Sequence, residues 1–195
     1  PGKDLLFSET IRTVLGLLHT TGVRTGEALG FDLQHFDSAQ DALFVAQGKF
    51  RKARWIPLSA TTSQALRAYL ECRSLRQAKP DSALFINRSG HRLTHAHLYR
   101  VFRRLLEACG ITHRPGFGPR LHDFRHTFAV HRLLEWYRQG VDINTKLPAL
   151  ATYMGHANLS GTRVYLQATP QLIEQVDERY RNHFLNHVLN KGELS

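Results

Sequence analysis

Apolar side chains along this chain recur mainly at steps of three and four residues, which is the period of an amphipathic helix. The first such series consists of Ile11, Val14, Leu15, Leu17 and Leu18. Ser8 has the residue type and position of a helix N-cap, and the Thr-Thr-Gly sequence ending at Gly22 is a suitable helix end. We therefore predict one helix from about Ser8 to Gly22, followed by a short helical turn from Thr25 to Leu29.

The same period returns in the rest of the chain. Further helices are predicted over Ser59–Gln77, Thr94–Cys109, His122–Gly140, Leu147–Met154, Gly161–Gln167 and Gln171–Val188. A Gly/Pro-rich loop, PGFGP at 115–119, separates the second of these helices from the third.

From Phe31 to Leu58 the helical period gives way to short runs of β-forming residues. DALFVAQGKF and RKARWIPL meet at a Gly-Lys turn region and predict an antiparallel hairpin. A third strand is expected at Ala83–Gly90, joining this hairpin. The chain shows no internal repeat and no low-complexity linker, so we predict a single domain over 1–195, mainly α (α+β), with a small antiparallel sheet near its front.

The chain carries a large positive charge, because 26 Lys and Arg residues against 16 Asp and Glu residues give a formal net charge of +10. Basic clusters recur at 51–54, 100–104 and 113–120. Such clusters are typical of a surface that binds a polyanion, and nucleic acid is the predicted partner over a basic surface without a ligand. The candidate contacts are Arg51, Lys52, Arg54, Arg100, Arg103, Arg104 and Arg120.

The two cysteines and the apolar runs bear on the compartment. Cys72 and Cys109 stand far apart without a CxxC pattern, as in a reducing cytoplasm. No run approaches the roughly 18 apolar residues of a membrane span, and no signal segment is evident. We expect a cytoplasmic protein without a membrane partner.

The segment HDFRHTFAVH at 122–131 holds three histidines and one arginine. His122 and His126 have a spacing that zinc can use, but Asp123 stands where the zinc-protease pattern requires Glu, and Arg125 disfavours a cation, so no metal is predicted. His126 and His131 are interpreted as structural histidines beside an apolar face. His122 and Arg125, three residues apart at a helix start, can instead face one phosphate.

Other parts of the chain supply partners for such an anion site. Arg24 lies in TGVRTGEAL, and Glu27 is placed to hold its guanidinium. Lys49 lies at the expected hairpin tip, and Tyr165 follows the His156 of an MGH sequence by nine residues. Taken singly, each has a structural explanation, such as a surface arginine or a core tyrosine.

Together, and in this order, these residues resemble the tyrosine recombinase (phage integrase) family. The resemblance covers about 8–170 and rests on four motifs: TGVRTGEAL, the GK hairpin, HDFRHTFA, and MGH with a tyrosine nine residues later. It implies a helical catalytic domain with a small antiparallel sheet. His156 lies 31 residues after Arg125, which is longer than in minimal members, so an inserted loop is expected between them.

The resemblance implies that Tyr165 attacks a DNA phosphodiester, forming a 3′-phosphotyrosine and freeing a 5′-hydroxyl, with no metal, ATP or other cofactor. Arg24 and Arg125 would hold the nonbridging oxygens, where charge builds in the transition state, with Glu27 supporting Arg24. Lys49 is the implied general acid, and Lys52 is its rival.

His122 and His156 would hydrogen-bond the scissile phosphate, and the base that removes the tyrosine proton stays open between them. The implied partners are double-stranded DNA and other recombinase protomers in a synaptic tetramer, joined through the tail helix at 171–195. An additional N-terminal core-binding domain of the family is expected to be absent from this chain. The implied location is the nucleoid of a bacterial cytoplasm.

Three other functions stay open at this point. A type IB topoisomerase-like or resolvase activity would use the same chemistry. A DNA-binding module could keep the fold and lack the reaction, although all six candidate catalytic side chains are present. A metal hydrolase built on His122 and His126 would be sensitive to chelators.

Overall fold

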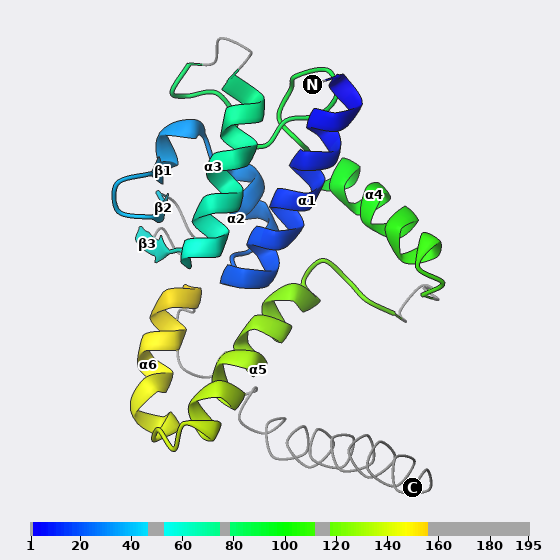
Figure 1. Cartoon of the computed structure of the whole chain (residues 1–195). Helices are drawn as coiled ribbons and strands as arrows, with labels where there is room; N and C mark the ends of the chain where they lie inside the picture. Colours follow the sequence, from blue (N-terminus) through cyan, green and yellow to red (C-terminus); the bar gives the residue numbers. More distant parts are fainter. Residues whose placement is uncertain (1, 47–52, 75–78, 112–117, 156–195) are drawn as a thin grey trace, which may run out of the picture.

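The computed structural model describes residues 2–46, 53–74, 79–111 and 118–155. Their helices are α1 (Lys3–Thr21), α2 (Thr25–Gly30), the short 3₁₀ helix η1 (Leu33–His35), α3 (Ala60–Ser74), α4 (His95–Ala108), α5 (Asp123–Arg138) and α6 (Ile143–Met154). The strands β1 (Phe36–Asp37), β2 (Ala42–Val45) and β3 (Arg54–Pro57) form one small sheet (Figure 1). The prediction of a mainly helical fold with a small antiparallel sheet is confirmed.

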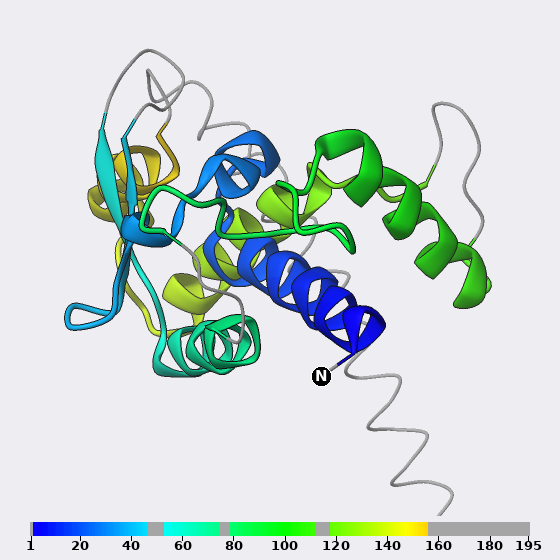
Figure 2. The same ribbon diagram turned by 90° about the horizontal axis from the view of Figure 1, so that it is seen from above.

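Helix α1 runs through the centre of the molecule, packing against both α3 and α5 (Figures 1 and 2). It begins at Lys3, so the prediction that Ser8 caps it is wrong, and the Ser8 hydroxyl donates to the Asp4 carbonyl inside the helix instead. The earlier start has a packing reason, because Leu6 and Phe7 are both buried in the main core and extend the apolar face toward the N-terminus.

The sheet has the order β1-β2-β3 with antiparallel pairing, and Leu43 faces Ile56 across the predicted hairpin. The expected third strand at 83–90 does not join it. This segment makes only isolated bridges, from Asp32 to Ala83 and from Ile86 to Arg92. Its backbone bonds to Phe31 and to its own returning turn, because Leu84 is fully buried in the main core rather than placed at a sheet edge.

Helix α4 has the predicted start, with the Thr94 hydroxyl accepting from the His97 N–H. Helix α6 begins at Ile143, four residues before the predicted start, with Asp142 capping its first turn. It accommodates Pro148 in its interior, and the burial of Leu147 and Leu150 on either side explains why packing prevails over the low helix propensity of proline.

Two apolar clusters result from this arrangement. The main cluster gathers α1, α2, the sheet, α3, α4 and the segment around Leu84. The smaller one joins α5 to α6 through Phe128, Leu133, Leu147 and Met154. In Figure 1, α5 and α6 form a layer beneath the rest, while α4 lies to the side. Within the described ranges, no helix has the length and apolar character of a membrane span.

Gly22 ends α1 where the two clusters meet. Its backbone is left-handed (φ 60°), and its N–H bonds to the Leu18 carbonyl at 3.0 Å. A Cβ at this position would lie 2.5 Å from Cδ1 of Phe128, so the ring of α5 occupies the space that a side chain would need. Both the conformation and the close approach therefore require glycine.

We expect Gly22→Ala to lower the free energy of unfolding by at least about 2 kcal/mol, from the left-handed backbone and the clash with Phe128. Gly16→Ala is the matched control, because no atom lies within 4 Å of a Cβ there. In the interior of α1 it should instead stabilise by about 0.5–1 kcal/mol. Urea unfolding followed by circular dichroism measures both, and equal effects of the two substitutions would contradict this account.

Candidate active site

Three of the predicted site residues, Arg24, Glu27 and Arg125, lie where the α1–α2 turn, β3, the start of α5 and the end of α6 meet. Arg24 is the N-cap residue of α2, Glu27 lies in the first turn of that helix, and Arg125 lies in the first turn of α5. Figure 1 shows the end of α6 directed toward β3 and α2, and contacts between α6 and β3 agree with this. The site is thus built from segments more than 120 residues apart in the sequence.

The Glu27 carboxylate is buried and pairs with two arginines. Its Oε1 accepts from Nη1 of Arg24 at 3.0 Å and from Nη1 of Arg54 at 3.1 Å. Its Oε2 accepts from Nη2 of Arg54 at 2.9 Å and from the backbone N–H of Arg24 at 3.2 Å. The side chains of Glu27 and Arg54 are both only 8% exposed. A carboxylate with this many donors holds both guanidinium groups in fixed orientations.

Arg24, Arg54 and Arg125 all donate to main-chain carbonyls at the end of α6. Nη2 of Arg24 lies 2.7 Å from the Gly155 oxygen, and Nη2 of Arg125 lies 2.5 Å from the Met154 oxygen. Nε of Arg54 donates to the Tyr153 oxygen at 2.8 Å. These are the orphan carbonyls of a helix C-terminus, where the helix dipole also favours positive charge.

Arg125 additionally links this helix end to the turn after α1. Its Nη1 donates to the Gly22 oxygen at 2.7 Å, and the residue is buried, with 3% of its surface exposed. The same side chain therefore ties α1, α5 and α6 together. Three arginines against one carboxylate leave this cluster positively charged.

The pKa of Glu27 reflects its surroundings. Burial alone would raise it, but the hydrogen bonds and positive charges of Arg54 and Arg24 outweigh burial and hold the pKa below 4.5. Glu27 is therefore ionised at neutral pH, and it is the ionised form that orients the arginines.

His122 lies immediately before α5, exposed at its start, and its ring meets the His126 ring edge-on at a centroid distance of 4.8 Å. Partial desolvation of the ring, followed by the charges of His126 and Arg125, lowers the pKa of His122 below 6.5. A neutral imidazole at pH 7 can accept a proton.

His131 is exposed on α5, and its ring meets that of His19 edge-on at 6.1 Å. The three histidines of the segment thus have different environments. Among the residues described here, no three His, Cys, Asp or Glu side chains are grouped as metal ligands.

Tyr153 adjoins this cluster through its carbonyl, which accepts from Arg54, but the environment of its hydroxyl is unsuited to nucleophilic attack. Its ring stacks on Phe128 at 5.5 Å, and burial raises its pKa to about 12. Its apolar surroundings and its place in the last turn of α6 give it a packing role. Tyr153 was not singled out in the sequence analysis. Its position two residues before Gly155, which ends α6, could have indicated that it lies in the last turn of that helix.

The arginines predicted to contact DNA occupy two kinds of environment. Arg100 and Arg104 are exposed on α4, and Arg103 lies between them with Nη1 at 3.4 Å from the Tyr99 hydroxyl. The Arg120 side chain is 69% exposed and pairs with Asp123. These four stay candidates for phosphate contacts.

The prediction that Arg54 contacts DNA does not agree with its geometry. Its guanidinium is buried, and each of its three nitrogens donates to Glu27 or to the Tyr153 carbonyl, so the basic cluster at 51–54 includes at least one side chain with an internal role. Sequence reasoning grouped it with its neighbours because charge alone does not reveal burial. Lys49, Arg51, Lys52, His156 and Tyr165 lie outside the described residues.

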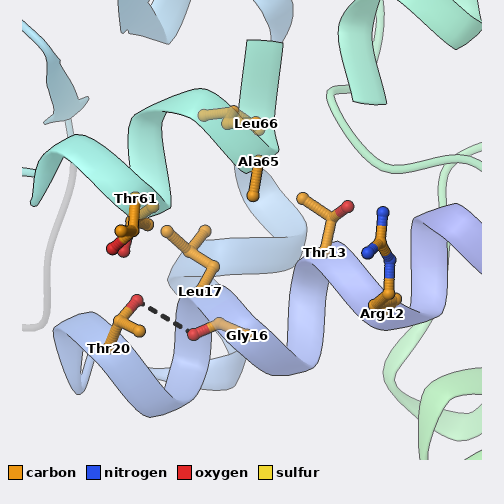
Figure 3. Close-up of a pocket in the computed structure, with 9 residues that line it drawn as sticks. Arg12, Thr13, Gly16, Leu17, Thr20, Thr61, Ala65 and Leu66 are labelled. Atoms are coloured by element: carbon orange, nitrogen blue, oxygen red, sulfur yellow. Dashed lines mark hydrogen bonds between the residues drawn. The ribbon is translucent and has the colours of Figure 1, made fainter. Parts of the chain in front are cut away.

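A hollow of about 260 Å³ lies elsewhere, between α1 and α3 (Figure 3). It is lined mainly by Thr13, Gly16, Leu17, Thr61 and Ala65, with Arg12 at one end. Arg24, Arg54 and Arg125 do not line this hollow, so it is separate from the arginine cluster described above.

The chain matches a family model described as the phage integrase family over residues 6–171. It is 37% identical over 171 residues to a putative integrase/recombinase (y4rE) of Sinorhizobium fredii, covering 87% of this chain and 54% of that protein. It is 29% identical over 186 residues to tyrosine recombinase XerC of Thermodesulfovibrio yellowstonii, covering 92% of this chain and 58% of that protein. The chain spans little more than half the length of these relatives.

Solved structures that are similar to this one include two site-specific or Xer-type recombinases. The XerH site-specific recombinase in a pre-cleavage complex with its difH substrate has a TM-score of 0.63 at 28% identity, covering 82% of this chain and 43% of that one. The XerA recombinase has a TM-score of 0.67 at 23% identity, covering 92% of this chain and 61% of that one, and supports the fold.

The lowered pKa of Glu27 gives a pH-dependent prediction. The folded state binds the carboxyl proton less readily than the unfolded state, so ionised Glu27 stabilises the fold above pH 4.5 and loses this effect as the pH falls through its folded pKa. We expect Glu27→Gln to lower the free energy of unfolding by about 3 kcal/mol at pH 7, since it leaves two arginines without their carboxylate. The difference should shrink at acidic pH.

Urea unfolding of both proteins across pH 3 to 8 measures this effect. Glu9→Gln is the matched control, because Glu9 pairs with an Arg12 side chain that is 71% exposed. Its change should stay below about 1 kcal/mol. A pH-independent loss in Glu27→Gln would mean that its ionisation contributes nothing.

Proposed function

Because this chain belongs to the phage integrase family, we propose that it is the catalytic part of a site-specific DNA recombinase. It would cleave and rejoin strands through a 3′-phosphotyrosine. The observation that carries the proposal is that Arg24 and Arg125 reach adjacent carbonyls at the end of α6, with Glu27 holding Arg24 in place. Two buried or half-buried guanidinium groups held this firmly are suited to a phosphate in its transition state.

In the proposed reaction the Tyr165 oxygen forms a bond to phosphorus while the bond from phosphorus to the 5′-oxygen breaks. The leaving 5′-oxygen takes a proton from Lys49 or Lys52, and the tyrosine proton passes to His122 or His156. The phosphodiester bond energy is kept in the phosphotyrosine, so a free 5′-hydroxyl can reverse the step or join a new strand without ATP.

The arginines suit the charge that develops on the nonbridging oxygens. A guanidinium is always protonated and carries five N–H donors, more than the two used in the described side-chain contacts of Arg24. Arg24 can therefore keep its contacts to Glu27 and Gly155 while it binds a phosphate oxygen. His122, with a pKa below its ordinary value, adds an uncharged ring beside the same helix start.

Double-stranded DNA is the proposed substrate, with the exposed arginines of α4 as phosphate contacts. Figure 2 shows α4 extending away from the sheet. Recombination joins two DNA sites, so further protomers are proposed to complete the reaction. The tail at 171–195, which lies outside the described residues, is proposed to contact them.

Covalent trapping tests the nucleophile. The DNA site is first selected by binding from a random-sequence pool, and the chain is then incubated in EDTA with duplexes nicked near the cleavage point, so that a short fragment diffuses away. We expect a protein–DNA adduct on a denaturing gel that is absent in Tyr165→Phe. Tyr153→Phe is the matched control and should keep the adduct. An unaltered chain that binds its site but forms no adduct would be a DNA-binding module.

Salt dependence tests the DNA contacts. The logarithm of the binding constant should fall linearly with the logarithm of the salt concentration, and each phosphate contact removed should reduce the slope by about 0.9. We expect Arg100→Gln and Arg104→Gln each to have this effect, whereas Arg12→Gln in the middle of α1 should not. An unchanged slope in the α4 variants would place the DNA on another face.

A further inference from the structure

Arg54 is the first residue of β3 and belongs to the basic cluster at 51–54, yet its side chain is as buried as that of Glu27, at 8% exposed. Its guanidinium donates three hydrogen bonds: both terminal nitrogens reach the Glu27 carboxylate, and Nε reaches the Tyr153 carbonyl. A single side chain thereby joins β3 to α2 and to the last turn of α6.

We infer that Arg54 is a positioning residue for the proposed reaction. It does not touch the DNA but fixes the Glu27 carboxylate and the end of α6, and through them Arg24 and the backbone at Gly155. The inference rests on the proposed function in that Arg24 and the residue after Gly155, His156, are candidate catalytic groups.

The geometry requires an arginine in particular. Two nitrogens of a planar fork match the two oxygens of a carboxylate, while the third donor points in another direction. A lysine has one nitrogen and cannot span Glu27 and Tyr153 in the same way. Without Arg54, Arg24 would be the remaining ion-pair partner of Glu27 among the described residues. The less firmly held carboxylate would then allow Arg24 to move away from the Gly155 carbonyl.

Gly155 provides independent support for this role. Its backbone is left-handed (φ 67°), and a Cβ there would lie 2.7 Å from Nη1 of Arg54. The guanidinium therefore lies directly against the main chain at the helix end. Because Gly155 has no side chain, the Arg54 guanidinium can lie against this left-handed helix end.

A direct contact of Arg54 with a DNA phosphate is the competing role, and it predicts different measurements. A phosphate contact would lower DNA affinity and reduce the salt slope by about 0.9 when removed. A positioning residue would leave affinity and slope unchanged and slow the chemical step. A purely structural residue would change stability without changing the rate in the folded protein.

The experiment compares Arg54→Gln and Arg54→Lys with Arg67→Gln. Arg67 is the matched control, because it also joins a carboxylate, Asp41, to a backbone carbonyl, that of Ser38, but does so on α3. Three quantities are measured under conditions where circular dichroism shows each variant to be folded: DNA affinity at several salt concentrations, the single-turnover rate of adduct formation, and amide hydrogen exchange along α6.

For both Arg54 variants we expect at least a tenfold slower adduct formation, DNA affinity within twofold of the parent, and at least tenfold faster exchange in the last turn of α6. Arg54→Lys keeps the charge, so a slow rate in this variant assigns the effect to the fork. The double variant with Glu27→Gln should be no slower than the slower single variant, because the two residues act as one unit. Arg67→Gln should match the parent throughout.

Unchanged exchange at the end of α6, or a parental rate in Arg54→Lys, would overturn the inference. Weaker DNA binding with a reduced salt slope would replace it with a phosphate contact. If the parent itself formed no adduct, the proposed function would fail, and the exchange measurement would still decide whether Arg54 holds the end of α6.

Discussion

The ionised carboxylate of Glu27, held between Arg24 and Arg54, is the interaction on which the arrangement of this site depends. A buried carboxylate is costly unless it is paired. Here Oε1 accepts from both guanidinium groups, and Oε2 accepts from the Arg54 guanidinium and the Arg24 backbone N–H. Moving any one of these three side chains away would leave a buried charge without its partner, and this free-energy cost holds the other two in place. Because the three side chains come from α2 and β3, this pairing sets the sheet against the helix that carries Arg24.

The C-terminal end of α6 is held by the same arginines and by Arg125. Its carbonyls at Tyr153, Met154 and Gly155 have no partners within their own helix, and three arginines from other elements satisfy them. The layer formed by α5 and α6 thus meets the main core through charged groups as well as through Phe128 and Gly22. The arginines that the proposed reaction needs for phosphate also act as structural links, which gives a reason for their burial and rigidity.

Rigidity of this kind suits a reaction in which the protein stabilises charge rather than supplying a cofactor. Donors that are already oriented need not reorganise when negative charge develops on the phosphate oxygens. The exposed arginines of α4 stand in contrast, since they lie in water and provide attraction to a polyanion without a fixed geometry. The chain therefore contains two populations of positive charge with different physical roles.

The sequence by itself determined the helical class and the hairpin, because hydrophobic periodicity is a local property of the chain. It also predicted Arg24, Glu27, His122 and Arg125 as members of one site from the order of their motifs, and the structure brings Arg24, Glu27 and Arg125 together at the end of α6. It also determined the glycines that end α1 and α6. It could not place the start of α1 or exclude 83–90 from the sheet, since burial of Leu6, Phe7 and Leu84 depends on distant partners.

Only the tertiary structure decided the role of Arg54. In the sequence it is one of three basic residues within 51–54, and nothing local distinguishes a solvated guanidinium from a buried one. Its partners are 27 and 99 residues away, so the distinction arises only when α2, β3 and α6 pack together. Charge is read from the residue type, but what a charge does depends on whether folding removes it from water.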